Sequence, residues 1–294
     1  MQVGILYTSH PDPKTEPYPH QAVHERVTNE ILEIEQLGFD SVWTFEHVIV
    51  PHDYESKYPY NKSGKMGAEP ETNFVDPLIA LTAIAQATKT IKLATGINIV
   101  SQTNPLLLAK QAASLDFVSG GRFMLGAGIG WLREEFEAMG TPFEKRGARF
   151  DDYMVAMKKV WSGETVEHES EFLSWHGFKS YPVPVQKPGV PVHMGGNKGK
   201  IFERIAKYGD GWFIPGANLK HLPGQLDELK SALEGEGREI GEIELSTIWV
   251  PQMGREMLDE MEKLGVERAV IMPSALGGDG GPGALKDFAK DYIG

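Results

Sequence analysis

Short apolar runs alternate with longer amphipathic segments along the whole chain, and we count eight such pairs. The runs predict strands at residues 3–7, 41–45, 91–99, 123–127, 190–194, 211–214, 244–250 and 269–273. The segments after them predict helices at residues 21–37, 75–88, 105–118, 147–161, 199–208, 221–234, 254–264 and 284–292. The strand at 269–273 is apolar throughout, which is typical of a parallel strand that is covered on both faces. Eight strand–helix units favour a closed (β/α)8 TIM barrel over an open sheet.

Two long connections interrupt this alternation. Residues 46–74 follow a strand and carry Tyr54, Tyr58 and Tyr60. Because the connections at the carboxyl ends of barrel strands build the active site, we expect residues 46–74 to form a lid or a substrate wall. Residues 162–189 follow a helix, so the same rule places them on the opposite face of the barrel unless they fold upward.

Composition and charge narrow the class of protein. The 294 residues suit one barrel domain with loop insertions over residues 1–294. The chain has no run of 18 apolar residues and no basic segment at its start, so we expect no membrane span, no signal peptide and a cytoplasmic location. It has no cysteine, which excludes disulfides and thiolate chemistry. The net charge of −12, with no separate basic patch, argues against a nucleic-acid partner.

The carboxyl ends of the predicted strands meet at one mouth, and this places several polar residues together. Glu46 and His47 end the second strand, and Thr95, Gly96 and Asn98 end the third. A histidine titrates near neutral pH, so His47 is a candidate general acid or base with Glu46 beside it. A histidine at a strand end is also commonly a structural, hydrogen-bonded residue, and the spacing alone leaves both interpretations open.

The fourth strand ends in the sequence GAGIGW, with glycines at Gly126, Gly128 and Gly130 followed by Trp131. Glycine weakens a strand, so three at alternate positions indicate that something approaches the backbone closely. Their spacing is not the dinucleotide-binding fingerprint. One interpretation is a strand that tapers into a tight turn with Trp131 as a core anchor. The other is a flat slot for a planar ring system.

The fifth strand runs into HMGGNKGK, which contains Gly195, Gly196, Asn197 and Lys198. Glycines before a helix start expose free amides that attract an anion, and a lysine adds positive charge, so this loop is a candidate phosphate site. A tight loop without a ligand is the alternative. The only charged residue of the glycine-rich segment 277–283 is an aspartate, which disfavours an anion, so we interpret this segment as a mobile loop.

Metal-dependent hydrolysis is a weaker alternative. It would use His47 and His193 with a metal ion, but the first strand lacks the H-x-H pair of barrel hydrolases and no H-E-x-x-H motif occurs, so we expect no metal site. Glu134 and Glu135 are interpreted as charges at a helix start and not as a paired-carboxylate site.

Four segments together resemble the luciferase-like family of flavin- and deazaflavin-dependent oxidoreductases, and the resemblance covers nearly the whole chain. They are LGFDSVWTFEHVIVP (37–51), NPLLLAKQAASLDFVSGGRFMLGAGIGWLREEFEAMG (104–140), KRGARFDDYMVAMKKVW (145–161) and PVHMGGNKGKIFERIAKYGDGW (191–212). The resemblance implies a (β/α)8 barrel, a homodimer, and a flavin-type ring in the barrel mouth.

The resemblance also implies roles for individual residues. His47 would face the reactive centre of the ring. Gly96, Ile97 and Asn98 match a bulged segment that backs the ring, sometimes with a non-prolyl cis peptide. The loop at 195–197 would take the cofactor phosphate, and the glycines that precede Trp131 would line the floor of the cofactor site.

We therefore expect an oxidoreductase that transfers a hydride between the deazaflavin coenzyme F420 and a small organic substrate. One alternative is an FMN-dependent monooxygenase, and a second is a protein that binds a flavin without catalysis.

Overall fold

The computed structural model describes residues 1–7, 20–216, 218–276 and 282–293, and the side chains of residues 20–24 and 282 are left aside. The predicted loop at 277–283 lies largely outside the described residues. The strands are β1 (Gln2–Leu6), β2 (Ser41–Thr44), β3 (Lys92–Thr95), β4 (Asn98–Ile99), β5 (Phe123–Gly128), β6 (Val166–Glu169), β7 (Ser174–Phe178), β8 (Val192–Gly195), β9 (Gly211–Ile214), β10 (Glu244–Ile248) and β11 (Arg268–Ile271). The α-helices are α1 (His20–Gln36), α2 (Pro77–Ala87), α3 (Pro105–Ser119), α4 (Arg133–Ala138), α5 (Arg146–Trp161), α6 (Ile201–Tyr208), α7 (Leu222–Gly235), α8 (Arg255–Lys263) and α9 (Pro282–Tyr292).

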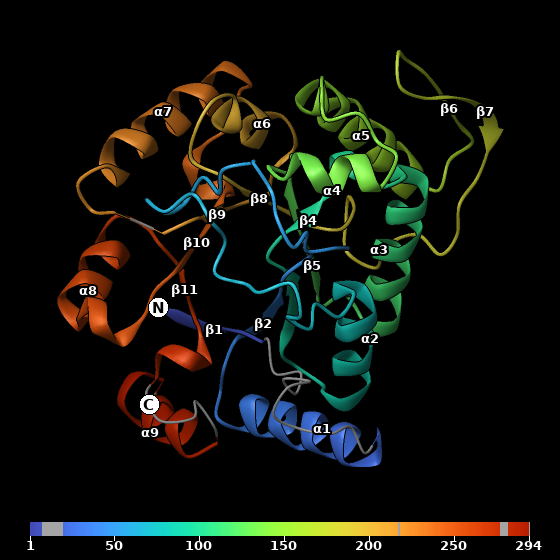
Figure 1. Ribbon diagram of the computed structural model, residues 1–294. Coiled ribbons are helices and arrows are strands. Elements are labelled where there is room, and N and C mark those ends of the chain that lie inside the picture. The colour runs from blue at the N-terminus through green and yellow to red at the C-terminus, as the bar shows by residue number, and fades with distance from the viewer. Residues whose placement is uncertain (8–19, 217, 277–281, 294) are drawn as a thin grey trace.

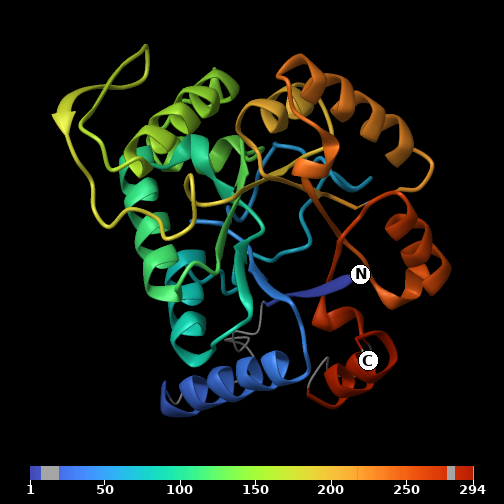
Figure 2. The same ribbon diagram turned by 180° about the vertical axis from the view of Figure 1, so that it is seen from behind.

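The main sheet is parallel and closes on itself. Its strand order is β3-β2-β1-β11-β10-β9-β8-β5-β4, and a further pairing of β3 with β5 joins the two ends. Helices surround this sheet in both face-on views (Figures 1 and 2). The predicted (β/α)8 barrel is therefore confirmed.

Alternation along each strand explains why both faces of the sheet are buried. Successive side chains of a strand point to opposite faces. In β2, Val42 packs outward against the helices, whereas Trp43 points into the barrel, where it stacks on Phe213 at a ring-centroid distance of 4.8 Å. The interior cluster is completed by Leu6, Ala94, Met124 and Val270, with Phe45, Ile97, Ile248 and Met272 partly buried against it.

The boundaries of α3 follow from the residues that cap it. The Asn104 side chain accepts hydrogen bonds from the amides of Leu106 and Leu107 at 3.0 and 3.3 Å, and Pro105 begins the helix. Gly120 ends it with φ of 71°, a left-handed conformation that glycine adopts without cost. The sequence predicted both ends.

Three local predictions were incomplete. The strand predicted at 91–99 is two strands, because the chain leaves the sheet between Thr95 and Asn98. The short helix α4 was not predicted. Residues 162–189 contain the antiparallel hairpin β6–β7, which packs outside α5 through a bond from His168 Nε2 to Asp152 at 2.8 Å.

The described helices include none that is both long enough and apolar enough to cross a membrane.

Candidate active site

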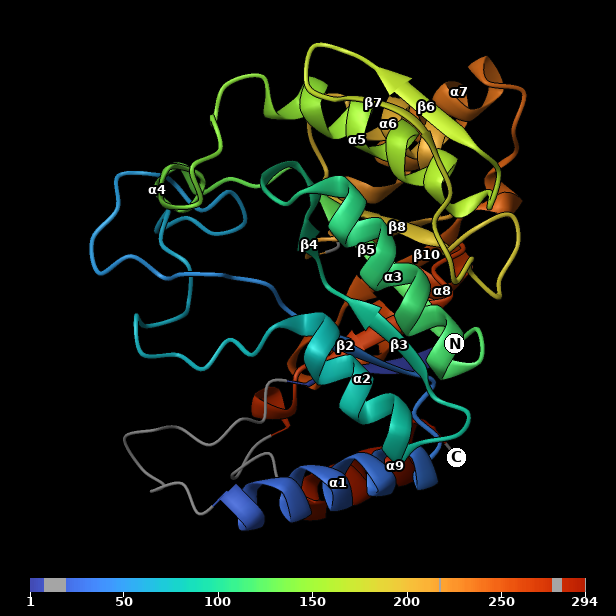
Figure 3. The same cartoon turned by 90° about the vertical axis from the view of Figure 1, so that its right-hand side faces the viewer.

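The connection 46–74 and α4 lie together at the carboxyl ends of the barrel strands (Figure 3). Two carboxylates in the first turn of α4 hold this connection in place. Glu134 accepts hydrogen bonds from the amides of Glu55 and Ser56 at 2.7 and 3.2 Å. The connection is therefore tied to a helix that is nearly 80 residues away in the sequence.

Glu135 fixes His47. Its carboxylate lies 3.1 Å from His47 Nδ1 and also accepts hydrogen bonds from the amides of Val48 and Ile49 at 2.6 and 3.4 Å. The side chain of Glu135 is only 2% exposed, and that of His47 is 13% exposed. A carboxylate at Nδ1 favours the tautomer that carries its proton there, which leaves Nε2 as the nitrogen available for chemistry.

The interpretation of Glu134 and Glu135 as helix-start charges was therefore incomplete. Both do lie in the first turn of α4. However, Glu135 is buried and pairs with the candidate catalytic histidine, so it is a candidate site residue that the sequence analysis missed. The acidic pair directly after Trp131 was the available signal.

Glu46 lies next to His47 and titrates near neutral pH. Burial raises its pKa to about 7, against the opposing effect of hydrogen bonds from the Ile99 amide and the Asn98 side chain. The negative charges of Glu135 and Asp76 raise the pKa further. Glu46 can thus take up or release a proton at physiological pH, as its predicted role requires.

Trp131 is the centre of an aromatic cluster under the connection. Its ring meets Tyr58 and Tyr54 edge to face, with centroid distances of 5.2 and 5.7 Å, and lies 6.3 Å from the His47 ring. Phe74 contacts the other side of His47 at 5.1 Å. Trp131 is half-buried and packs against the 46–74 connection, not in the barrel core, and its role beside a planar ring stays a prediction.

The glycines of β5 make room for the chain itself. A side-chain carbon at Gly126 would overlap the carbonyl oxygen of Thr95, and one at Gly128 would overlap the side chain of Ile97. Gly130 has φ of 75° and faces Phe136 and Ile99. The close approach that these glycines predict is real, but the approaching group is the segment between β3 and β4.

That segment forms a bulge at the mouth. The Thr95 hydroxyl donates to the carbonyl of Gly126 at 2.9 Å, and the peptide bond between Gly96 and Ile97 is cis. Ile97 lies above the interior cluster, against the positions of Gly128 and Gly195. Asn98 follows, is 3% exposed and has no hydrogen-bond partner at Oδ1.

The loop after β8 has the features of an anion site. Gly196 has φ of 132° and Gly199 has φ of 67°, with no atom within 4 Å of where a side chain would begin at Gly199. The Gly196 carbonyl is held by Trp212 Nε1 at 2.7 Å. Asn197 is half-buried and Lys198 is exposed, one turn before α6 begins. Open space, glycine conformations and a free lysine fit a phosphate group.

The connection and this loop lie close together. A side chain at Gly196 would lie 4.0 Å from the Tyr60 hydroxyl. Tyr60 in turn meets Tyr58 at a centroid distance of 5.4 Å, and Tyr58 meets Trp131. The candidate ring-backing, proton-transfer and phosphate residues therefore surround one mouth.

His193 does not belong to this mouth, contrary to its expected position at the strand end. It pairs in register with Gly211, the first residue of β9, and its Nδ1 lies 3.8 Å from Glu244, the first residue of β10. Burial and the positive charges of Arg268 and Lys92 lower its pKa to about 3, so it is neutral. His47 and His193 lie toward opposite ends of the barrel, which removes the hydrolase alternative that joined them.

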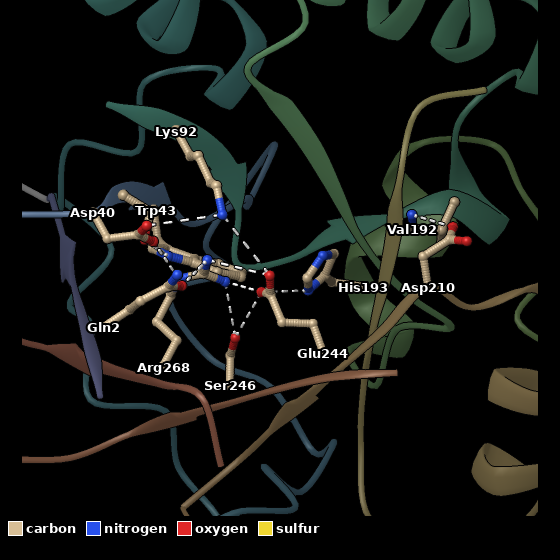
Figure 4. A network of polar contacts seen from close by, with 11 residues as sticks. Gln2, Asp40, Trp43, Lys92, Val192, His193, Asp210, Glu244, Ser246 and Arg268 are labelled. Carbon is tan, nitrogen blue, oxygen red and sulfur yellow. Dashed lines mark hydrogen bonds and ion pairs between the residues drawn. The ribbon is translucent and has the colours of Figure 1, made fainter. Parts of the chain in front are cut away.

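The amino-terminal end of the barrel holds a buried ionic network (Figure 4). Arg268 is 0% exposed and donates to Asp40 at 2.6 Å, to Gln2 at 2.8 Å and to both oxygens of Glu244. Lys92 lies 3.8 Å from Asp40 and 4.0 Å from Glu244. Both carboxylates of this network therefore have cationic partners. Within the described residues, no group of three His, Asp or Glu side chains is arranged to hold a metal ion.

Comparison with known proteins identifies the family. The profile of the luciferase-like monooxygenase family matches residues 1–275. The chain therefore belongs to this family.

Two relatives and one solved structure illustrate the range of the family. An uncharacterised protein of Mycobacterium tuberculosis is 31% identical over 179 residues, which are 60% of this chain and 63% of the relative. The FMNH2-dependent dimethylsulfone monooxygenase of Pseudomonas putida is 27% identical over 164 residues, 54% of this chain and 45% of the relative. The match thus spans less than two thirds of these relatives. The coenzyme F420-dependent tetrahydromethanopterin reductase of Methanopyrus kandleri shares the fold, with a TM-score of 0.75, 17% identity and coverage of 99% of this chain and 98% of that one.

Proposed function

We propose that this enzyme transfers a hydride between a deazaflavin of the coenzyme F420 type and a small organic substrate at the barrel mouth. The observation that carries the proposal is the set formed by His47, Glu135 and Glu46 beside the Ile97 bulge. It places an imidazole that is held by a carboxylate, and a carboxyl group whose pKa is raised to about 7, beside a segment that the family resemblance assigns to the ring. The similarity to an F420-dependent reductase supports the deazaflavin.

Residues on two sides of the mouth would hold the cofactor. Thr95, Gly96, Ile97 and Asn98 would back the ring, with Gly128, Gly130 and Trp131 beneath and beside them. Gly195, Gly196, Asn197 and Lys198 would bind the phosphate, because their open glycine backbone and free lysine suit an anion. When bound, a deazaflavin supplies hydride chemistry and reacts poorly with oxygen.

The chain's own residues handle the proton and exclude water. His47 would give a proton to the substrate, or take one from it, through Nε2, since Glu135 holds Nδ1. Glu46 would replenish that proton, as its pKa near 7 allows exchange in either direction. The aromatic cluster of Trp131, Tyr54 and Tyr58 would cover the reacting groups.

An FMN-dependent monooxygenase is the second candidate, because a relative of that type matches 54% of this chain. Both candidates use the same mouth and the same phosphate loop. A binding protein without turnover is the third candidate.

The experiment loads the purified protein with F420 or with FMN and records the absorbance after desalting. The proposal expects retention of F420 and substrate-dependent change of its spectrum without consumption of oxygen. Retention of FMN alone, with oxygen uptake, would establish the monooxygenase instead. Tight retention without turnover across a compound panel would establish the binding protein. Gly196→Val should abolish retention, because it fills the phosphate loop, whereas Gly237→Ala in an exposed turn should not.

We also propose that the enzyme is a homodimer whose copies meet through α2 and α3. The exposed positions of these adjacent helices are Ile79, Thr82, Ala83, Gln86, Leu107, Lys110, Gln111, Phe117 and Val118. None is acidic, although the net charge of the chain is −12, so two copies can meet here without like-charge repulsion. Light scattering should give a dimer mass, and Phe117→Lys should give a monomer, whereas Met253→Lys on the far side of the barrel should not.

A further inference from the structure

One buried hydrogen-bond acceptor at the mouth, Asn98 Oδ1, has no donor. Glu46 accepts from the Ile99 amide and the Asn98 side chain, and Glu135 accepts from His47 and two backbone amides. Asn98 uses its amide nitrogen on Glu46, and its Oδ1 is buried without a partner. A buried acceptor without a donor costs free energy, so a bound group that donates here would be stabilised.

The charge of the mouth is negative. The charges that act on Glu46 are those of Glu135 and Asp76, which are both acidic. Among the described residues, no lysine or arginine bonds to Glu46, Glu135 or Asn98. The barrel's other end differs, since its acids have Arg268 and Lys92. An anionic group next to Glu46 would therefore be repelled, and a cationic one attracted.

The aromatic side chains favour the same ligand chemistry. Phe74 and Trp131 lie next to His47, Tyr58 contacts Trp131, and Tyr60 contacts Tyr58. Burial raises the pKa of the Tyr58 and Tyr60 hydroxyls, so both stay uncharged. The face of an uncharged aromatic ring attracts a cation, most strongly where water is excluded.

We propose that the substrate of this enzyme carries a protonated amine, which binds Glu46 and Asn98 Oδ1 beside the aromatic cluster. The proposal rests on the proposed function, because it assigns the substrate class of the same site.

The test compares three compounds with one carbon skeleton and different charges: isopentylamine, isopentanol and isovalerate. Calorimetric titrations of the cofactor-loaded enzyme should show the amine binding about tenfold more tightly than the alcohol, the equivalent of one cation–π contact in a desolvated site. Isovalerate should bind most weakly. Equal or tighter binding of the alcohol, or no binding of the amine, would overturn the proposal.

Two variants test whether Glu46 causes the preference for the amine. Glu46→Gln should remove the preference for the amine and leave the affinity for isopentanol unchanged. Asp53→Asn removes an acid of the same connection whose side chain is 95% exposed, and it should leave the preference intact. A preference that persists in Glu46→Gln would contradict the proposed contact.

Proton release gives a second measurement. A cation next to Glu46 should displace its proton at pH 7, and titrations in two buffers of different ionisation enthalpy detect the released proton. His47, Glu135 and Asp76 also face Glu46 and can titrate, so release that survives in Glu46→Gln would contradict the assignment to Glu46. Cofactor absorbance separates the two proposals. If the enzyme retains cofactor but shows no preference for the amine, only the proposed substrate class is contradicted. If it retains no cofactor, the proposed function itself is contradicted.

Discussion

The two ends of the barrel use the same kinds of charged residue in opposite ways. At the amino end, Asp40 and Glu244 are paired with Lys92 and with the fully buried Arg268. At the carboxyl end, Glu46 and Glu135 lie together with His47 as their titratable neighbour. Acids paired with cations fix a structure, whereas Glu46, which is buried and has no cationic partner among the described residues, has a raised pKa. The contrast distinguishes the end that supports the fold from the end that we propose as the active site.

The largest effect on turnover should come from His47→Asn. The substitution removes Nε2 as a proton-transfer group, so kcat should fall by about 10²- to 10⁴-fold. Cofactor retention, measured by absorbance, should stay unchanged, because the phosphate loop is untouched. Full turnover in a variant that retains cofactor would remove the proposed role of His47.

A comparable effect on stability should come from Arg268→Met at the other end. The variant leaves the half-buried Asp40 and Glu244 without their main cation, which should lower the free energy of unfolding by about 3–5 kcal/mol in urea titrations. Lys263→Met breaks only an exposed ion pair with Glu260 and should leave the unfolding midpoint unchanged. The folded fraction of Arg268→Met should bind cofactor normally, and loss of binding would contradict the division between the two ends.

A smaller effect should come from Glu135→Gln, which keeps the side-chain shape but leaves one acceptor oxygen for three donors. Loss of the defined His47 orientation should lower kcat by about 10- to 100-fold, as for other partners that orient a functional histidine. Glu134→Gln is the matched control, since it lies on the same helix turn and does not contact His47. Equal losses in both variants would indicate that anchoring of the connection, and not orientation of His47, is the cause.

An effect limited to one pH range should come from Glu46→Gln. An acid whose pKa is higher in the folded chain holds its proton more tightly when folded, so its contribution to stability is lost as pH rises from 4.5 to about 7. The variant should therefore match the parent near pH 4.5 and exceed it above pH 7, by at most about 3 kcal/mol. Thermal unfolding across this range measures the difference, and parallel curves would contradict the raised pKa.

The fold was predictable because its signals are local. Strands buried on both faces are apolar throughout, and the ends of α3 follow from Asn104, Pro105 and Gly120. The split of the third strand was not predictable from that segment alone. It depends on Gly126 and Gly128 of the neighbouring strand. Because these residues have no side chain, there is room for the Thr95 carbonyl and the Ile97 side chain.

The site was predictable in its parts and not in its connections. Glu46, His47 and Asn98 do lie together, as the shared mouth of a barrel requires. The pairing of His47 with Glu135 spans 88 residues and no local pattern encodes it. The position of His193 inside the barrel, near the amino end, depends on two things: whether its side chain points into the barrel, and how the neighbouring strands are staggered. Both are set by closure of the whole barrel.

The attachment of His47 to Glu135 has a consequence for protein engineering. One carboxylate on α4 holds the histidine ring and the first amides of the 46–74 connection. A chimera that receives this connection from another barrel would lose the partner for its histidine unless residues 131–136 were exchanged with it. Residues 46–74 and residues 131–136 must therefore be exchanged together. A shuffling library should place its crossovers so that both segments come from the same parent.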